Sequence, residues 1–122
     1  MRIVTDHKLN GLNDQLHIEA MDEPVQGRAC HKYEIRLAAT DGTNKVWPID
    51  FQNGPVKESG FNGLSQESLL AIVIDHLRSF QAGQYSCREN AIALTKVEEA
   101  MLWLKKRTQD RLSRGVEGTN IK

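Results

Sequence analysis

The chain has 122 residues, of which 39% are hydrophobic and 26% charged, and its 16 basic side chains balance 16 acidic ones. This length predicts a single domain, residues 1–122, with a modest core. Zero net charge does not favour a nucleic acid or a membrane surface as the partner. No N-terminal segment resembles a signal peptide, and no apolar run approaches the roughly 18 residues of a membrane span. Two cysteines are too few for a disulfide scaffold or a metal site, so we expect a reduced cytoplasmic protein.

The N-terminal half predicts a small antiparallel sheet. Residues 1–13 mix short apolar groups with turn-forming ones, so a strand, a loop and a mobile arm all remain open. Residues 15–21 alternate apolar and polar side chains, which is typical of a strand. Residues 30–39 repeat that alternation, and the TDGTN segment at 40–44 predicts a hairpin turn.

A third strand is expected over residues 46–51. Pro48 lies within it and has no N–H to donate, so this strand should lie at a sheet edge or carry a bulge. Residues 52–63 then form a glycine-rich connection that is long for a compact domain. Long ordered loops are often functional.

The rest of the chain predicts a helical hairpin, and the fold class is therefore α+β, with residues 1–63 as sheet and loop and residues 64–122 as hairpin and tail. Ser65 is a suitable N-cap for the first helix, ahead of a dense apolar run. Gly83 is expected to end that helix in the left-handed conformation.

The second helix is predicted to begin at the SCRE capping box, residues 86–89. Apolar residues then recur at helical spacing on one side: Leu94, Val97, Met101, Leu104 and Leu112. Nothing breaks the pattern before Gly115, so the helix should run for about 27 residues, or roughly 40 Å. A helix of this length in so short a chain predicts packing against a copy of itself.

Basic residues concentrate at the end of this helix, with five between positions 105 and 114 against Asp110 alone. Arg107, Arg111 and Arg114 fall on one stripe, and Trp103 lies one turn earlier. Guanidinium groups bind phosphates and an indole stacks on bases. A solvated basic helix end, stabilised by the helix dipole, remains the alternative.

Three further residues carry two interpretations each. Phe80 either closes the core of the hairpin or stacks on a ligand. Asn90, in the first helical turn, either reads a base or ribose or serves as a local cap. Lys57 either reaches a phosphate from its loop or is merely solvated.

Catalytic patterns are weak. The four histidines (His7, His17, His31 and His76) lack metal-binding spacing. Cys87 lies at a helix start, where a thiolate is favoured, but no nucleophile motif surrounds it. We therefore predict no enzyme activity, no metal and no cofactor.

Several segments, in this order and spacing, resemble the phage anti-Thoeris signal sponges: residues 49–52, 54–55, 70–75, 80–83, 88–90, 97–100, 103–104 and 114–119. The helical hairpin alone also resembles the phage anti-CBASS cyclic-nucleotide sponges. The resemblance covers about residues 30–120. It implies an anti-defence protein that acts in the host cytoplasm during infection.

The resemblance also implies ligands and an assembly. Members of this family sequester, without cleaving, glycocyclic ADP-ribose isomers made by TIR-domain proteins, and members of the wider group hold cyclic di- or trinucleotides. They form dimers and often hexamers, with pockets at subunit interfaces. The resemblance assigns one set of residues to the cyclic ADP-ribose site: Phe80, Asn90, Lys57 and Arg28. It assigns a second set to cyclic trinucleotides near an assembly axis: Arg107, Arg111, Gly115 and Thr119.

Two alternatives from other classes stay open. A small nucleic-acid-binding regulator would use the basic helix end, and its binding would weaken steeply with salt. A nucleotide-cleaving enzyme would return altered ligand on denaturation. Neither DNA nor a membrane is expected as the partner.

Overall fold

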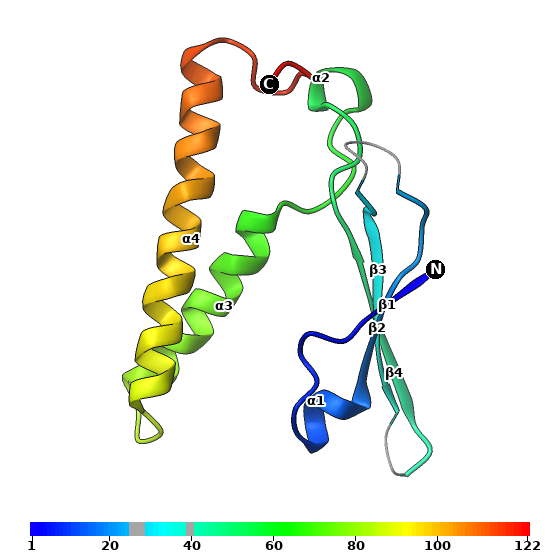
Figure 1. The fold of residues 1–122 in the computed structure, drawn as a ribbon, viewed down its shortest axis with the longest axis vertical. Helices are drawn as coiled ribbons and strands as arrows, with labels where there is room; N and C mark the ends of the chain where they lie inside the picture. The colour runs from blue at the N-terminus through cyan, green and yellow to red at the C-terminus, as the bar shows by residue number, and fades with distance from the viewer. Residues whose placement is uncertain (25–28, 39–40) are drawn as a thin grey trace. The chain divides into compact units, whose positions relative to one another are not determined.

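The computed structural model describes most of the chain: residues 1–24, 29–38 and 41–122. Its contacts divide the chain into two compact units (Figure 1): residues 1–54 with 61–64, and residues 55–60 with 65–122. The first unit contains a four-stranded sheet and the second contains the helical hairpin. The α+β class, with a small N-terminal antiparallel sheet followed by a C-terminal helical hairpin, is confirmed.

The sheet has the strand order β1-β2-β3-β4, and each strand is antiparallel to its neighbour. The strands are β1 (Arg2–Val4), β2 (Leu16–Ala20), β3 (Lys32–Ala38) and β4 (Asn44–Asp50). The three predicted strands, two of them from alternation and the third from its place after the hairpin turn, are therefore confirmed. Residues 2–4, whose structure the sequence left open, form the fourth strand.

A short helix, α1 (Gly11–Gln15), precedes β2 and was not expected. The Asn10 side chain caps it by accepting the Asn13 N–H at 3.0 Å. A single helical turn contains too few residues to show an apolar period, so the pattern could not reveal it.

The register of β2 and β3 places their apolar residues opposite one another. Leu16 faces Leu37, Ile18 faces Ile35, and Ala20 faces Tyr33. Because directly opposite residues point to the same face, the two strands share one apolar face. Ala20 is fully buried there.

Pro48 lies on β4, the last strand in the order of the described sheet, so the first of its two predicted settings, an edge strand rather than a bulge, is the one found. In the preceding turn the Asp41 carboxylate accepts hydrogen bonds from Thr43, at 2.6 Å from Oγ1 and 2.9 Å from the backbone N. These bonds hold the pKa of Asp41 below its ordinary value. Thr40, the first residue of the predicted turn, lies outside the described residues.

The glycine-rich connection contains another unexpected helical turn, α2 (Val56–Ser59). Pro55 precedes it with φ −65°, which suits a helix start, and Gly60 ends it at φ 70°. The segment expected to be loop throughout is therefore partly helical, and α2 belongs to the unit of the hairpin.

The hairpin consists of α3 (Gln66–Gln81) and α4 (Arg88–Ser113). The predicted cap of α3 is confirmed, because Ser65 Oγ accepts the Ser68 N–H at 3.1 Å. At 26 residues, α4 has nearly its predicted length. Within the described ranges, no helix is long and apolar enough to cross a membrane.

Two local predictions at the turn between these helices are wrong. Gly83 has no positive φ; α3 ends at Gln81 with Ala82 in the right-handed region. The N-cap of α4 is Cys87, whose Sγ accepts the Asn90 N–H at 3.4 Å, and not Ser86. The cause is Gln81, whose side-chain amide binds the backbone N and O of Cys87 at 3.1 and 3.0 Å and so holds Cys87 extended.

The apolar face of α4 also differs from prediction at its end. Leu94, Val97, Met101 and Leu104 are half-buried, but Leu112 is 60% exposed. The buried position is taken by Arg111, which follows Leu104 by seven residues and so lies on the same side of the helix.

Candidate functional site

An apolar pocket of about 340 Å³ lies at the turn of the hairpin. Its walls come from the end of α3 and from the turn: His76, Ser79, Phe80, Gly83, Gln84 and Tyr85. Gln81 holds this turn to the start of α4 through its two bonds to Cys87. These two hydrogen bonds therefore hold the turn that forms part of the pocket wall.

Phe80 lies at the centre of an aromatic group in this pocket. The His76 ring meets it edge-on, with ring centroids 4.9 Å apart, and the Tyr85 ring lies 6.5 Å away. Phe80 is 38% exposed and lines the pocket. Its ring is available to a planar ligand.

Asn90 and Lys57 do not line this pocket. Asn90 is half-buried in the first turn of α4, and its backbone N–H is bound to Cys87 Sγ. Its side-chain amide has no hydrogen bond among the described residues. One chain therefore does not bring Phe80, Asn90 and Lys57 into one pocket, and Arg28 lies outside the residues that the structure describes.

Lys57 lies instead against the C-terminal tail, residues 115–122. Its backbone N donates to the Gly118 carbonyl at 3.1 Å. A side chain at Gly118 would approach Lys57 Cγ to 3.3 Å, and Gly118 has φ 82°. Lys57, which the resemblance assigns to the cyclic ADP-ribose site, therefore contacts the tail, which the resemblance assigns to the cyclic-trinucleotide site.

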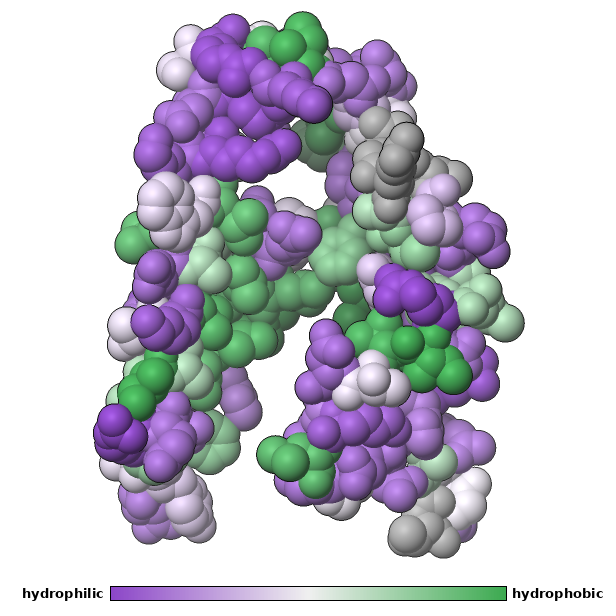
Figure 2. All heavy atoms as spheres, viewed as in Figure 1, coloured by the Kyte–Doolittle hydropathy of each residue, from purple (hydrophilic) through white to green (hydrophobic). Residues whose placement is uncertain are grey.

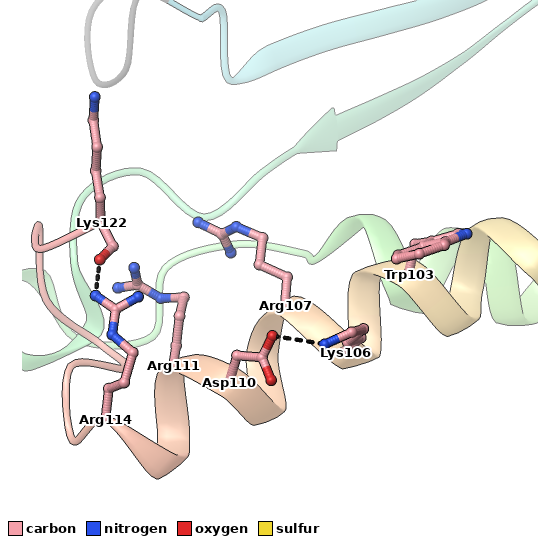
Figure 3. A pocket seen from close by; sticks show the side chains of 7 residues that line it. All are labelled: Trp103, Lys106, Arg107, Asp110, Arg111, Arg114 and Lys122. Atoms are coloured by element: carbon pink, nitrogen blue, oxygen red, sulfur yellow. Dashed lines mark hydrogen bonds and ion pairs between the residues drawn. The ribbon is translucent and has the colours of Figure 1, made fainter.

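A basic pocket of about 440 Å³ lies at the far end of α4 (Figure 3). It carries five basic side chains, one acidic one and an indole: Trp103, Lys106, Arg107, Asp110, Arg111, Arg114 and Lys122. Figure 2 shows hydrophilic side chains gathered where α4 runs into the tail. The structure therefore groups the arginines and the tryptophan that the sequence singled out.

The cations of this pocket are not equally available. Lys106 pairs with Asp110 at 3.1 Å, and Arg114 donates to the Lys122 carbonyl. Arg107 is exposed and has no ion pair or side-chain hydrogen bond within the described part of the chain. Trp103 is 64% exposed beside it.

Arg111 is engaged by the tail. Its Nε donates to Glu117 Oε2 at 3.0 Å, and its terminal nitrogens donate to three carbonyls, those of Val116, Thr119 and Ile121. With 7% of its surface exposed, Arg111 is the charged residue that lies buried in the described ranges.

Gly115 and Thr119 shape the tail and do not line the pocket. Gly115 has φ 72°, and the bonds Gly115 N to Leu112 O and Val116 N to Arg111 O form a Schellman motif. The Thr119 hydroxyl donates to the Val116 carbonyl and accepts the Ile121 N–H at 3.2 Å. These contacts turn the chain back toward Arg111.

The two pockets are lined mainly by aromatic, basic and polar side chains. No group of three or more His, Cys, Asp or Glu side chains could hold a metal ion in the ranges searched. The arrangement can stack a planar base at one end of the hairpin and bind anions at the other.

His76 and Tyr85 are pocket residues that sequence reasoning missed. His76 precedes Phe80 by four residues and therefore lies on the same helix face. That spacing was a usable signal, whereas nothing in the turn sequence indicated that Tyr85 approaches Phe80.

Comparison with known proteins identifies the hairpin. The family model of the Acb2/Tad1 hairpin domain matches residues 48–109, just over half of the chain. The chain is also similar to the Thoeris anti-defense 1 protein of Bacillus phage SBSphiJ7, with 49% identity over 87 residues, or 71% of this chain. The match covers 61% of that relative's length. The chain therefore belongs to the Acb2/Tad1 hairpin-domain family, which confirms the resemblance to the phage anti-Thoeris signal sponges.

Proposed function

We propose that this protein is a phage anti-defence protein that binds glycocyclic ADP-ribose signals of TIR-domain proteins and holds them without cleavage in the host cytoplasm. The observation that supports this most is the aromatic pocket at the turn of a hairpin of the Acb2/Tad1 family. A similar phage protein carries the name Thoeris anti-defense 1.

The chemistry of the pocket suits an adenine nucleotide. A base that stacks on Phe80 gains about 1–3 kcal/mol, and the edges of His76 and Tyr85 limit where that base can lie. A volume of about 340 Å³ is at the small end of ligand pockets. Holding a ligand needs tight binding and no general acid or base.

The basic pocket suits a second, more anionic ligand. We infer that it takes cyclic di- or trinucleotides, with phosphates at Arg107 and a base against Trp103. DNA binding by this end of the helix is less favoured, because Lys106, Arg111 and Arg114 already have partners within the chain. A stretch of duplex DNA would need many available cations.

The proposed sequestration has a direct test. Purified protein is incubated with panels of cyclic ADP-ribose isomers and cyclic oligonucleotides, desalted and heat-denatured, and the released molecules are weighed by mass spectrometry. We expect a stoichiometric amount of unchanged ligand. Release of a hydrolysed product would identify an enzyme, and capture of neither ligand class would refute both sites.

We further propose that the protein assembles as dimers or as hexamers built from them. Figure 2 shows hydrophobic residues along the surface of the hairpin. Several apolar side chains of the two helices are exposed: Ile72 67%, Val73 44%, Leu102 67%, Trp103 64% and Leu112 60%. Exposed apolar side chains that gather on one surface are typical of protein interfaces. A second copy could also bring Asn90 and Lys57 to the Phe80 pocket, which one chain does not do.

Light scattering at micromolar concentration should therefore give at least twice the 13.8 kDa of one chain. Leu102→Lys should lower the mass, because it places a charge in the proposed interface. Leu12→Lys is the matched control, since Leu12 is 62% exposed on α1 of the other unit. A clean monomer from the parent protein would contradict the assembly.

A further inference from the structure

The side chain of Gln81 closes the turn between α3 and α4 (Figure 1). Gln81 is the last residue of α3, and Cys87 is the N-cap of α4. Gln81 Nε2 donates to the Cys87 carbonyl at 3.0 Å, and Gln81 Oε1 accepts the Cys87 N–H at 3.1 Å. A glutamine amide carries donors and an acceptor side by side, so it can bind both polar groups of one backbone residue. The two bonds therefore fix the ends of the segment 82–86.

The three rings at the apolar pocket are placed in two different ways. His76 and Phe80 lie four residues apart on α3, so the helix itself places them on one face. Tyr85 lies within the turn and is 69% exposed, with its ring centroid 6.5 Å from that of Phe80. Because helical geometry does not place a turn residue, the position of Tyr85 depends on the path of residues 82–86.

Gln81 does not line the pocket itself. It is half-buried, and both the nitrogen and the oxygen of its amide are bound to Cys87. The pocket wall on either side of it is formed by Phe80 before it and by Gly83, Gln84 and Tyr85 after it. An effect of Gln81 on a ligand in this pocket would therefore act through the turn that it holds.

We propose that Gln81 is a positioning residue of the cyclic ADP-ribose site: it orders the turn so that Tyr85 borders the Phe80 ring before a ligand binds. This inference rests on the function proposed above for the aromatic pocket. A wall that is already ordered loses little conformational freedom on binding, and the affinity is higher for that reason. The inference adds Gln81 and Tyr85 to the residues on which capture of the signal depends.

Gln81→Met tests the role, because methionine has a similar length and forms neither hydrogen bond. Calorimetry uses the full chain and the glycocyclic ADP-ribose isomer that the parent protein retains in the mass-spectrometry test. We expect the affinity to fall about 3- to 10-fold. Gln66→Met is the matched control: it makes the same change in the first turn of α3, at an exposed residue without a side-chain hydrogen bond in the described ranges. Light scattering and circular dichroism verify that each variant assembles and keeps its helices.

A double-mutant cycle distinguishes positioning of Tyr85 from a general loosening of the hairpin. Tyr85→Ala removes the ring that Gln81 is proposed to position, so adding Gln81→Met to it should lower the affinity little further. If Gln81 only stabilised the hairpin, the two losses would add in full.

Fluorine NMR of protein labelled with 3-fluorotyrosine reports the position of Tyr85 directly, without a ligand. The chain has two tyrosines, and the other, Tyr33, packs edge-on against Phe51 in the sheet unit, with ring centroids 5.8 Å apart. Tyr33 is therefore an internal reference. We expect Gln81→Met to shift the Tyr85 signal and to leave the Tyr33 signal in place, whereas Gln66→Met should shift neither.

The outcomes separate this inference from the function on which it rests. If the parent protein retains no cyclic ADP-ribose isomer, the proposed site is wrong and the role of Gln81 is wrong with it. If the parent binds the isomer, the site stands, and any one of three results overturns the role: parent-like affinity in Gln81→Met, an unshifted Tyr85 signal, or fully additive losses. Weaker binding with a shifted Tyr85 signal and little further loss in the double variant supports it.

Discussion

Replacing Arg107 by glutamate is expected to abolish cyclic oligonucleotide binding and to leave cyclic ADP-ribose capture nearly unchanged. Arg107 lines the basic pocket and is free of partners among the described residues. Its guanidinium group is therefore available to bind the phosphate of a ligand in the pocket. Losing a charge-assisted hydrogen bond and gaining a repulsion should cost about 3 kcal/mol or more. That corresponds to a loss of affinity of at least about 100-fold.

The other ligand should be unaffected because the two pockets share no lining residue. Asn90 and Arg107 lie 17 positions apart on α4, roughly 25 Å along the helix axis. A small ligand at the hairpin turn cannot reach both positions on one helix.

Calorimetry of both ligands against Arg107→Glu tests this separation, after light scattering has verified the assembly. Lys105→Glu is the matched control, since it reverses a neighbouring charge that does not line the pocket. Equal loss of both ligands in a correctly assembled variant would mean that they share one site.

Phe80→Ala is expected to weaken cyclic ADP-ribose capture by about 1–3 kcal/mol, the contribution of one stacked base. The free-energy loss corresponds to an affinity lower by about 5- to 150-fold. Folding should change little, because Phe80 is partly exposed and its ring contacts are with His76 and Tyr85 at the pocket.

Titration of the cyclic ADP-ribose signal against Phe80→Ala and Phe61→Ala measures this effect. Phe61 is 92% exposed in the sheet unit, so its removal deletes an aromatic ring away from the pocket. If Phe80→Ala binds the signal as tightly as the parent protein does, the apolar pocket is not the cyclic ADP-ribose site. Parallel titration of Asn90→Ala tests whether the Asn90 amide, which has no hydrogen bond among the residues that the structure describes, adds a ligand contact. A comparable loss is expected.

Local patterns in the sequence were sufficient where neighbouring residues decide the structure. Alternation predicted β2 and β3, and the hairpin turn predicted β4 after them. The missing N–H of Pro48 predicted an edge strand or a bulge, and the Ser65 hydroxyl predicted a helix cap. The uninterrupted helical period predicted the length of α4. The order and spacing of the motifs also predicted the family that the hairpin match confirms.

Short elements were not predictable in this way. The helices α1 and α2 span only five and four residues, so neither shows an apolar period. Their positions depend on single capping residues such as Asn10, which are also common in plain turns.

Only the tertiary structure decided what the polar side chains bind. The helix cap lies at Cys87, whose backbone the Gln81 side-chain amide binds across the turn, six residues away. Arg111 and Arg107 look alike in sequence, yet one is buried under the tail and the other is exposed. The period of a helix predicts the side on which an arginine lies, but its role depends on which carbonyls and carboxylates reach its N–H groups, and the turns at Gly115 and Gly118 bring those acceptors to Arg111.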